Sequence, residues 1–181
     1  MRGLLPLLVL IAVALLAGCE NPLELDRDTE IAIGRDAAAQ LEAKYGVVDD
    51  AAGQRRLDYI GARAAAASQE PSFPWSFKIL DSKEINALAL PGGFVYVTRG
   101  MLDYVENDDQ LAGVVAHEVV HVDHHHAKAG IEKAMTQSLL VELVTRKSSR
   151  TIKQAAGIAL ELELREGYRD KEYESDQFGT L

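Results

Sequence analysis

Residues 107–126 read NDDQLAGVVAHEVVHVDHHH, and this stretch decides how the rest of the chain is interpreted. Asn107 or Asp108 is a favourable N-cap, because a short polar side chain can accept a hydrogen bond from a free amide of the first helical turn. Apolar residues then recur at helical spacing, at Leu111, Val114, Val115, Val119 and Val122. The pattern predicts an amphipathic helix.

Three polar residues on this helix form a metal-binding pattern: His117, Glu118 and His121. Residues four apart on an α-helix lie one turn above each other, at about 6 Å, so both imidazoles can bind one metal ion. Glu118 lies about 100° around the helix from His117. With zinc polarising a scissile carbonyl, Glu118 would take a proton from the attacking water and give it to the leaving amine. We predict one zinc ion per chain. If the two histidines and the glutamate had this spacing by chance, three polar side chains would lie on an apolar helix at a cost in free energy and without a function.

Zinc needs a third protein ligand, with water in the open fourth position. A metzincin would take this ligand from a histidine ten residues after His117, but that position is Ala127, so this subclass is excluded. His125 lies eight residues after His117, about 12 Å along the axis, too far to share one ion. We interpret residues 124–126, three histidines, as a solvated helix end near the negative pole of the helix dipole. Support behind the metal site, or a second metal ion, is the alternative.

Acidic residues further along the chain are candidates for the third ligand. They are Glu142, Glu161, Glu163, Glu166 and Glu172. Glu166 and Glu172 are each followed four residues later by an aspartate, Asp170 or Asp176, which could hydrogen-bond a ligand histidine. Spacing alone leaves these candidates open.

The flanking sequence predicts an α+β fold, mostly helical, with a small antiparallel sheet. Helical spacing is found at residues 28–45, 50–68, 101–105, 127–147 and 151–164, and from 170 toward the C-terminus. Residues 76–80 and 94–98 are rich in β-branched and aromatic residues and predict strands. Between them, residues 86–90 and a Pro-Gly-Gly turn at 91–93 predict a hairpin.

The N-terminus has the features of an export signal. Arg2 is followed by an apolar run and then by Leu16-Ala17-Gly18-Cys19. The run is shorter than the roughly 20 residues that a bilayer-spanning helix needs, although a retained transmembrane anchor is the alternative. Residues 16–19 resemble the bacterial lipoprotein signal, in which the cysteine is lipidated. We therefore expect a signal peptide at 1–18, a lipidated tether at 19–28 and a peptidase domain at 29–181.

Composition supports one domain outside the cytoplasm. The 181 residues fit a single domain. The chain has one cysteine, which excludes an intramolecular disulfide, and lipidation explains an unpaired cysteine in an exported protein. The net charge is −9, with the acidic residues scattered, which argues against nucleic acid as a partner.

Three blocks of the sequence together resemble metallopeptidase family 48, the CAAX-prenyl-protease and HtpX type of gluzincin, including its bacterial periplasmic members. Residues 86–102 read NALALPGGFVYVTRGML, residues 109–121 read DQLAGVVAHEVVH, and residues 172–179 read EYESDQFG. The third block is similar to the family's E-x-E-A-D-x-x-G pattern, with Ser175 in place of alanine. The resemblance implies a zincin-like fold in which Glu172 is the third zinc ligand and Asp176 supports a ligand histidine.

The same resemblance implies that the hairpin lies along the substrate cleft. Asn86, Phe94 and Tyr96 are then candidates for the cleft wall, and an edge strand there can pair with an extended peptide. Ordinary packing within the sheet is the alternative for Phe94 and Tyr96.

The predicted function is a membrane-anchored zinc endopeptidase that cleaves unfolded or misassembled proteins of the bacterial envelope. Glu20, directly after the lipidated cysteine, favours the outer membrane. A chaperone-like lipoprotein that holds clients without cutting them is one alternative, and metal storage by the histidine cluster is another. Leu181 follows closely after the third block, where family members usually continue with further helices, so we expect a shortened member or a fragment without a helical-repeat domain.

Overall fold

The structure, a computed structural model, describes residues 24–137 and 149–164. Several predictions lie outside the described residues: the lipidation of Cys19, the roles of Glu172 and Asp176, and the helix from residue 170. The predicted α+β fold, mostly helical with one small sheet, is confirmed. None of the helices within the two described ranges is long and apolar enough to cross a membrane.

Three strands form one mixed sheet, β1 (Ser76–Leu80), β2 (Ala87–Leu90) and β3 (Phe94–Thr98), in the order β1-β3-β2. β2 and β3 form the predicted antiparallel hairpin. β1 instead runs parallel to β3, so the prediction of a purely antiparallel sheet is wrong for this pair. The reason lies in β3, whose residues after Phe94 are all buried. A strand this deeply buried takes the central position, where neighbours on both edges satisfy its backbone hydrogen bonds.

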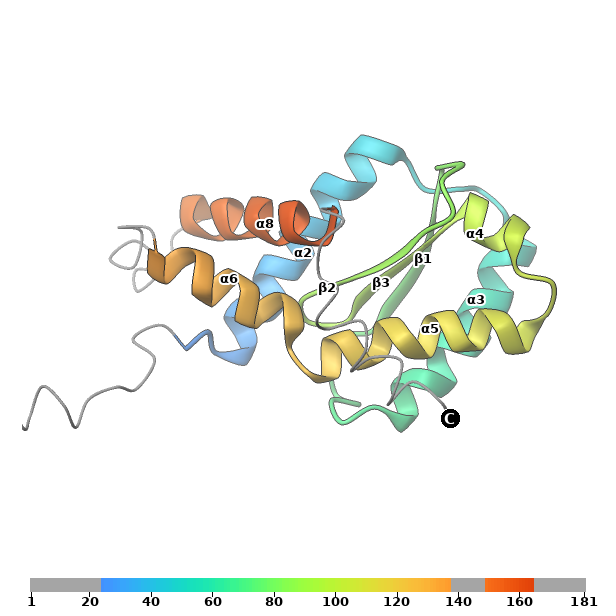
Figure 1. Ribbon diagram of the computed structural model, residues 1–181, viewed down its shortest axis with the longest axis horizontal. Coiled ribbons are helices and arrows are strands. Elements are labelled where there is room, and N and C mark those ends of the chain that lie inside the picture. The colour runs from blue at the N-terminus through green and yellow to red at the C-terminus, as the bar shows by residue number, and fades with distance from the viewer. Residues whose placement is uncertain (1–23, 138–148, 165–181) are drawn as a thin grey trace, which may run out of the picture.

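Helices cover both faces of the sheet, as Figure 1 shows. α2 (Arg27–Tyr45), α6 (His126–Gln137) and α8 (Ser149–Leu164) share one apolar cluster with Tyr96 and Leu88. α3 (Ala51–Ala67) and α5 (Asp108–Asp123) share a second cluster with Val95 and Val97. Successive residues of β3 therefore point to opposite faces, as a strand between two helical layers requires.

The predicted helices lie close to their expected positions. α5 begins after Asn107, whose side chain accepts a hydrogen bond from the amide of Gln110 at 2.9 Å, as the sequence predicts for an N-cap. The short helix α4 (Arg99–Tyr104) is capped in the same way by Thr98. The predicted helix at 127–147 corresponds to α6, which the structure describes as far as Gln137.

The turn between β2 and β3 packs tightly against α2. Gly92 has φ 76°, and a Cβ atom added there would lie 2.8 Å from the Cα atom of Ile31. A Cβ atom added to Gly34 would lie 1.8 Å from the carbonyl oxygen of Pro91. Because no side chain larger than hydrogen fits at either place, these contacts fix the position of α2 beside the end of β2.

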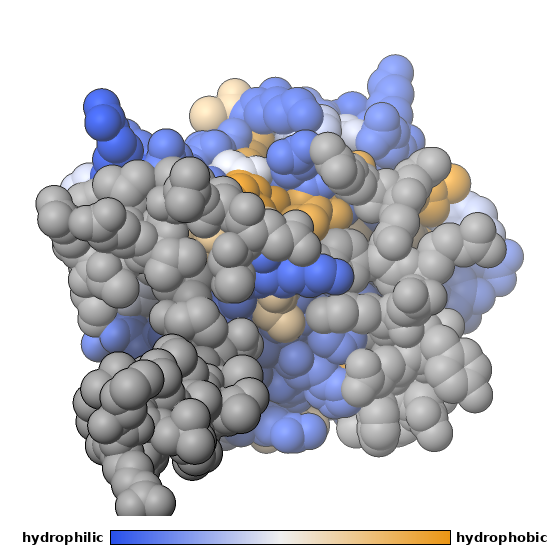
Figure 2. Space-filling model, turned by 60° about the vertical axis from the view of Figure 1, so that its left-hand side comes forward, coloured by the Kyte–Doolittle hydropathy of each residue, from blue (hydrophilic) through white to orange (hydrophobic). Residues whose placement is uncertain are grey.

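Few large apolar side chains are exposed among the residues that the structure describes. Those that exceed one third exposure come from several different elements, and they are Val47, Tyr59, Ile85, Tyr104 and Leu164. On the face drawn in Figure 2, apolar residues are visible over a limited area among hydrophilic ones.

Candidate active site

The two histidines of α5 converge on one point. The Nε2 atoms of His117 and His121 lie 3.1 Å apart, and the ring centroids are 4.8 Å apart. Two nitrogens that bind one tetrahedral zinc ion at about 2.0–2.1 Å lie about 3.3 Å apart. The observed separation is close to this value, so the pair fits two ligands of a single zinc ion.

Glu118 lies beside this pair in a sheltered position. The residue is 9% exposed, and His121 is 8% exposed, while His117 is half-buried. Neighbouring positions on an α-helix differ by about 100°, so Glu118 flanks the ligand pair. A carboxylate held there, away from bulk water, is suited to take up and return a proton next to a bound carbonyl.

Within the described residues, no group of three or more His, Cys, Asp or Glu side chains could hold a metal ion. His117 and His121 could supply two ligands of a zinc ion, which would need a third from the protein. The sequence candidates Glu142, Glu166 and Glu172 are outside the described ranges. Glu161 is exposed on α8, whereas Glu163, also on α8, lines a hollow together with His121.

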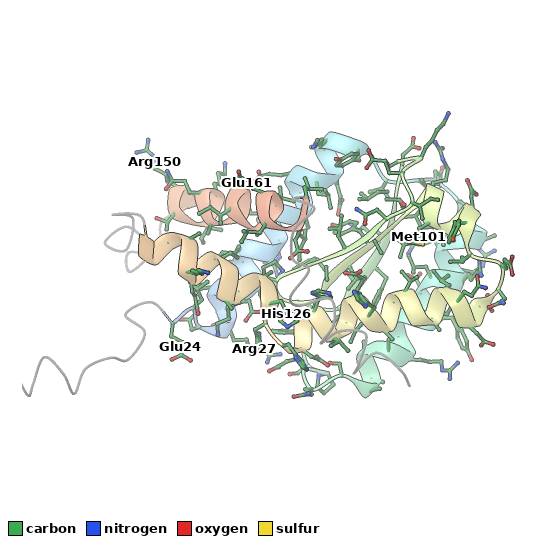
Figure 3. All side chains as sticks on the ribbon, in the orientation of Figure 1. Glu24, Arg27, Met101, His126, Arg150 and Glu161 are labelled. Atoms are coloured by element: carbon green, nitrogen blue, oxygen red, sulfur yellow. The ribbon has the colours of Figure 1, made fainter. Side chains whose placement is uncertain are left out.

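A third histidine, His126, supports the pair from behind. Its Nδ1 atom lies 3.0 Å from Nδ1 of His121, and the two rings meet nearly edge to face at 86°. When Nε2 of His121 binds a metal, the ring proton must lie on Nδ1, which then donates to Nδ1 of His126. Figure 3 shows His126 at the junction of α5 and α6. His126 thus fixes the orientation of the His121 ring.

The prediction of a solvated helix end at residues 124–126 is wrong. α5 ends at Asp123, His126 is 4% exposed, and the ring of His124 lies edge to face with that of His126 at 5.5 Å. The alternative interpretation, support behind the metal site, describes His126. No spacing rule could have found this residue, because positions five apart lie about 140° apart on a continuous helix. Only the backbone reversal at His125, φ 51°, brings the two rings together.

The end of β2 lies next to the site. A small hollow of about 10 Å³ is lined by Ala89 and Leu90 of β2 and by His121 and Val122 of α5. The amide of Thr98 donates to the carbonyl of Asn86 at 3.0 Å, so these two residues form a hydrogen-bonded pair. Hydrogen-bonded and non-hydrogen-bonded pairs alternate along an antiparallel ladder. It follows that Ala87 and Ala89 direct their N–H and C=O groups away from β3, along the outer edge of β2.

The cleft candidates are divided between the edge and the core. Asn86 is half-buried and pairs with Thr98 at the start of β2. Tyr96 is 1% exposed, and its hydroxyl donates to Oε1 of Glu42 on α2 at 2.6 Å. Phe94 is half-buried and packs against the same cluster as Tyr96. The packing alternative therefore holds for Tyr96, because it faces α2 rather than α5.

Comparison with known proteins gives related peptidases. The sequence model described as "Peptidase family M48" matches residues 51–181. A putative beta-barrel assembly-enhancing protease of Vibrio cholerae is 28% identical over 133 residues, which cover 74% of this chain and 25% of that protein. The metalloprotease YcaL of Escherichia coli K12 is 27% identical over 188 residues, covering 92% of this chain and 74% of YcaL. The mitochondrial metalloendopeptidase OMA1 of Arabidopsis thaliana is 30% identical over 139 residues, covering 75% of this chain.

The lengths of these proteins differ from that of the chain. It spans only about a quarter of the beta-barrel assembly-enhancing proteases it matches. The matched part includes α5 and the β2–β3 hairpin, whereas α2 lies outside the region of the family match.

Proposed function

The chain belongs to peptidase family M48, and on that premise we propose that it is a zinc-dependent endopeptidase that cleaves unfolded or misassembled proteins of the bacterial cell envelope. The observation that carries the proposal is the 3.1 Å approach of the Nε2 atoms of His117 and His121, with the buried Glu118 beside them.

The residues divide the work as follows. His117, His121 and Glu172 would hold the zinc ion, and Asp176, four residues after Glu172, would support one of the two ligand histidines. Zinc bound there would polarise the scissile carbonyl and lower the pKa of water. Glu118 takes the proton of the attacking water and returns it to the leaving amine, and His126 keeps the ring of His121 in place.

The outer edge of β2 favours unfolded substrates. Ala87 and Ala89 direct main-chain donors and acceptors away from β3, and Ala89 lines the hollow beside His121. A peptide can pair with such an edge only when it is extended. A folded protein rarely exposes an unpaired extended segment, because its backbone groups are already hydrogen-bonded. Misassembled or unfolded chains do expose such segments, so main-chain pairing selects them without requiring a particular side chain.

The location follows from the N-terminal sequence and the relatives. We propose that residues 1–18 are removed, that lipid on Cys19 anchors the protein, and that Glu20 directs it to the outer membrane, facing the periplasm. Two relatives are named for enhancing beta-barrel assembly, and this supports a place in the cell envelope.

The competing function is a chaperone-like lipoprotein that holds extended clients on β2 without cutting them. Metal storage has less support, because His125 is hydrogen-bonded to Glu30 and His126 to His121. Cleavage of casein by the full chain, purified in detergent, separates peptidase from chaperone when compared with Glu118→Gln. One zinc per chain in both proteins, with cleavage only by the parent, supports the peptidase. Zinc in both without cleavage by either favours the client-holding alternative, and absence of zinc contradicts the proposal.

A further inference from the structure

The turn between α5 and α6 has an unusual backbone. His125 has φ 51°, the one positive value among non-glycine residues in the part of the chain that the structure describes. This left-handed conformation is unfavourable for a residue with a Cβ atom. A histidine that holds it needs side-chain contacts that a glycine would not need.

Those contacts come from helix α2. Nδ1 of His125 lies 3.0 Å from Oε1 of Glu30, whose side chain is only 3% exposed. The other ring nitrogen, Nε2, lies 3.9 Å from Oε1 of Glu70, and the edge of the ring meets Phe73 at 87°. Glu30 is the tighter partner, and it lies in α2, outside the region that the family model matches.

The position of Glu30 does not depend on this contact. Neighbouring residues of α2 pack against the β2–β3 turn, where Gly34 approaches Pro91 and Ile31 approaches Gly92. These contacts pack α2 closely against the turn, so Glu30 is positioned by contacts other than its hydrogen bond to His125. Glu30, His121 and His125 also line the same small hollow.

From this geometry we propose that His125, held by Glu30, is a positioning residue for the metal site: the pair locks the α5–α6 turn in the reversed conformation that sets His126 against His121. The inference rests on the proposed function, since it assumes that His121 is a metal ligand. The backbone links the parts directly, because His126 is the next residue and the amide of Ala129 donates to the carbonyl of His125 at 2.9 Å.

The charges around His125 make the lock pH-dependent. The groups that face it are Glu30 of α2, Glu70 of the loop before β1, and Lys128 of α6. Glu163 of α8 lines the same hollow, and Arg27 pairs with Glu70. The hydrogen bond from Glu30 raises the pKa of His125, outweighing burial and Lys128, which both lower it. The charge-dependent part of the lock is therefore fully present below the ordinary pKa of about 6.5 and is lost as the pH rises through the raised value. A neutral ring can still donate its Nδ1 proton to Glu30, so the loss is partial.

The test measures zinc affinity of the full chain in detergent, by competition with a chelator, for Glu30→Gln and His125→Gly. We expect about fivefold weaker zinc binding in each, because outer partners of metal ligands typically contribute 10- to 100-fold and this pair acts one step further out. The deficit should shrink as the pH rises from about 6 to about 8.5, the range in which a histidine with a raised pKa loses its charge. Glu70→Gln, the matched neutralisation at 3.9 Å, should stay within about twofold, since Glu70 lies too far from the ring for a hydrogen bond and its charge is already paired with Arg27.

Several results would overturn the inference. His125→Gly removes the backbone strain together with the ring, so zinc binding equal to or tighter than that of the parent would mean that the ring positions nothing. A deficit of the same size at every pH would also contradict it. If the parent binds no zinc, the proposed function fails instead, and the two failures remain distinguishable.

A measurement on the unaltered protein covers the case in which a variant does not fold. In the metal-free full chain, backbone amide resonances of residues 124–129 should shift with the titration of the His125 ring. Shifts confined to His125 itself would show that the turn does not respond to the Glu30 contact, and the inference would fall.

Discussion

Helix α5 and the turn that follows it contribute to the same site in different ways. His117 and His121 meet because they are four residues apart on one helix, and nothing else in the chain is needed to bring their rings together. His126 meets His121 only because the backbone reverses at His125, which is bound to Glu30 from a distant part of the sequence. The approach of the two proposed ligands is thus a local property of the sequence, whereas the contact that supports His121 is a property of the packed fold.

This difference predicts how the two regions respond to change. Loss of a ligand should remove the metal outright, because the remaining groups cannot replace it. Loss of a supporting residue should weaken metal binding by a measurable factor, because the ligands keep their helical spacing. The predictions that follow test this contrast in order of decreasing effect.

The largest effect is expected for His121→Ala. The variant should bind no zinc at stoichiometric concentration and should show no detectable casein cleavage, because two ligands cannot hold the ion in place of three. Zinc content of the purified full chain and casein hydrolysis provide the measurement. Asp109→Asn, an exposed change on the same helix, is the control and should leave both values unchanged.

Glu172→Gln tests the proposed third ligand. A neutral amide is a much poorer zinc ligand than a carboxylate, so the variant should lose its zinc during purification. Glu166→Gln, the other glutamate followed by an aspartate four residues later, is the matched control and should retain one zinc per chain. If Glu166→Gln loses zinc and Glu172→Gln retains it, the third ligand is Glu166 and not Glu172.

His126→Ala should weaken zinc binding by about 10- to 100-fold without abolishing it, the usual effect of removing an outer partner of a ligand histidine. His126→Gln should recover part of this loss, because its amide can still accept a hydrogen bond from His121. Chelator competition measures both affinities. An alanine variant that binds zinc as tightly as the parent would remove the distinction between ligands and support.

The smallest effect is expected for Tyr96→Phe. Removal of the hydroxyl should lower the free energy of unfolding by about 1 kcal/mol, because a single hydrogen bond to Glu42 is lost while Lys78 still binds that carboxylate. Denaturant titration measures this change, and KM for a peptide substrate should not change. A raised KM with unchanged stability would restore Tyr96 as a residue of the substrate cleft.

The network around Glu42 also has a defined pH dependence. Burial alone would raise the pKa of Glu42, but hydrogen bonds from Lys78 and Tyr96 outweigh it and lower the pKa. The contribution of this carboxylate to stability is therefore present above its unfolded pKa of about 4.3 and is lost as the pH falls through the lowered value. The free energy of unfolding should fall between neutral and acid pH as Glu42 takes up a proton. This fall should be smaller in Tyr96→Phe than in the parent, because one of the hydrogen bonds that lower the pKa of Glu42 is missing.

Much of the fold was predictable because its signals are local. The periodic apolar residues of α5, the cap at Asn107 and the Pro-Gly-Gly turn each depend on a few neighbouring residues. The parallel pairing of β1 with β3 was not predictable in this way. It depends on which strand is buried most deeply, and that is decided only when helices cover both faces of the sheet.

The site divides along the same line. His117, Glu118 and His121 follow from a helical spacing rule, whereas His125 and His126 were misinterpreted because their sequence contains neither glycine nor proline to mark a reversal. Tyr96 was assigned to the cleft from a resemblance, and its inward direction follows from the alternation of β3 between two cores. Residues whose role depends on a partner in another element therefore require the structure.

The most direct test of the central claim is zinc K-edge absorption spectroscopy on the full chain in detergent. The account predicts one zinc ion bound by two imidazole nitrogens at about 2.0–2.1 Å, with the remaining positions filled by oxygen. Three or more imidazoles would mean that His126 or a neighbour binds the metal rather than supporting His121. A sulfur neighbour would point to Cys19, and either of these results, or the absence of zinc, would contradict the account.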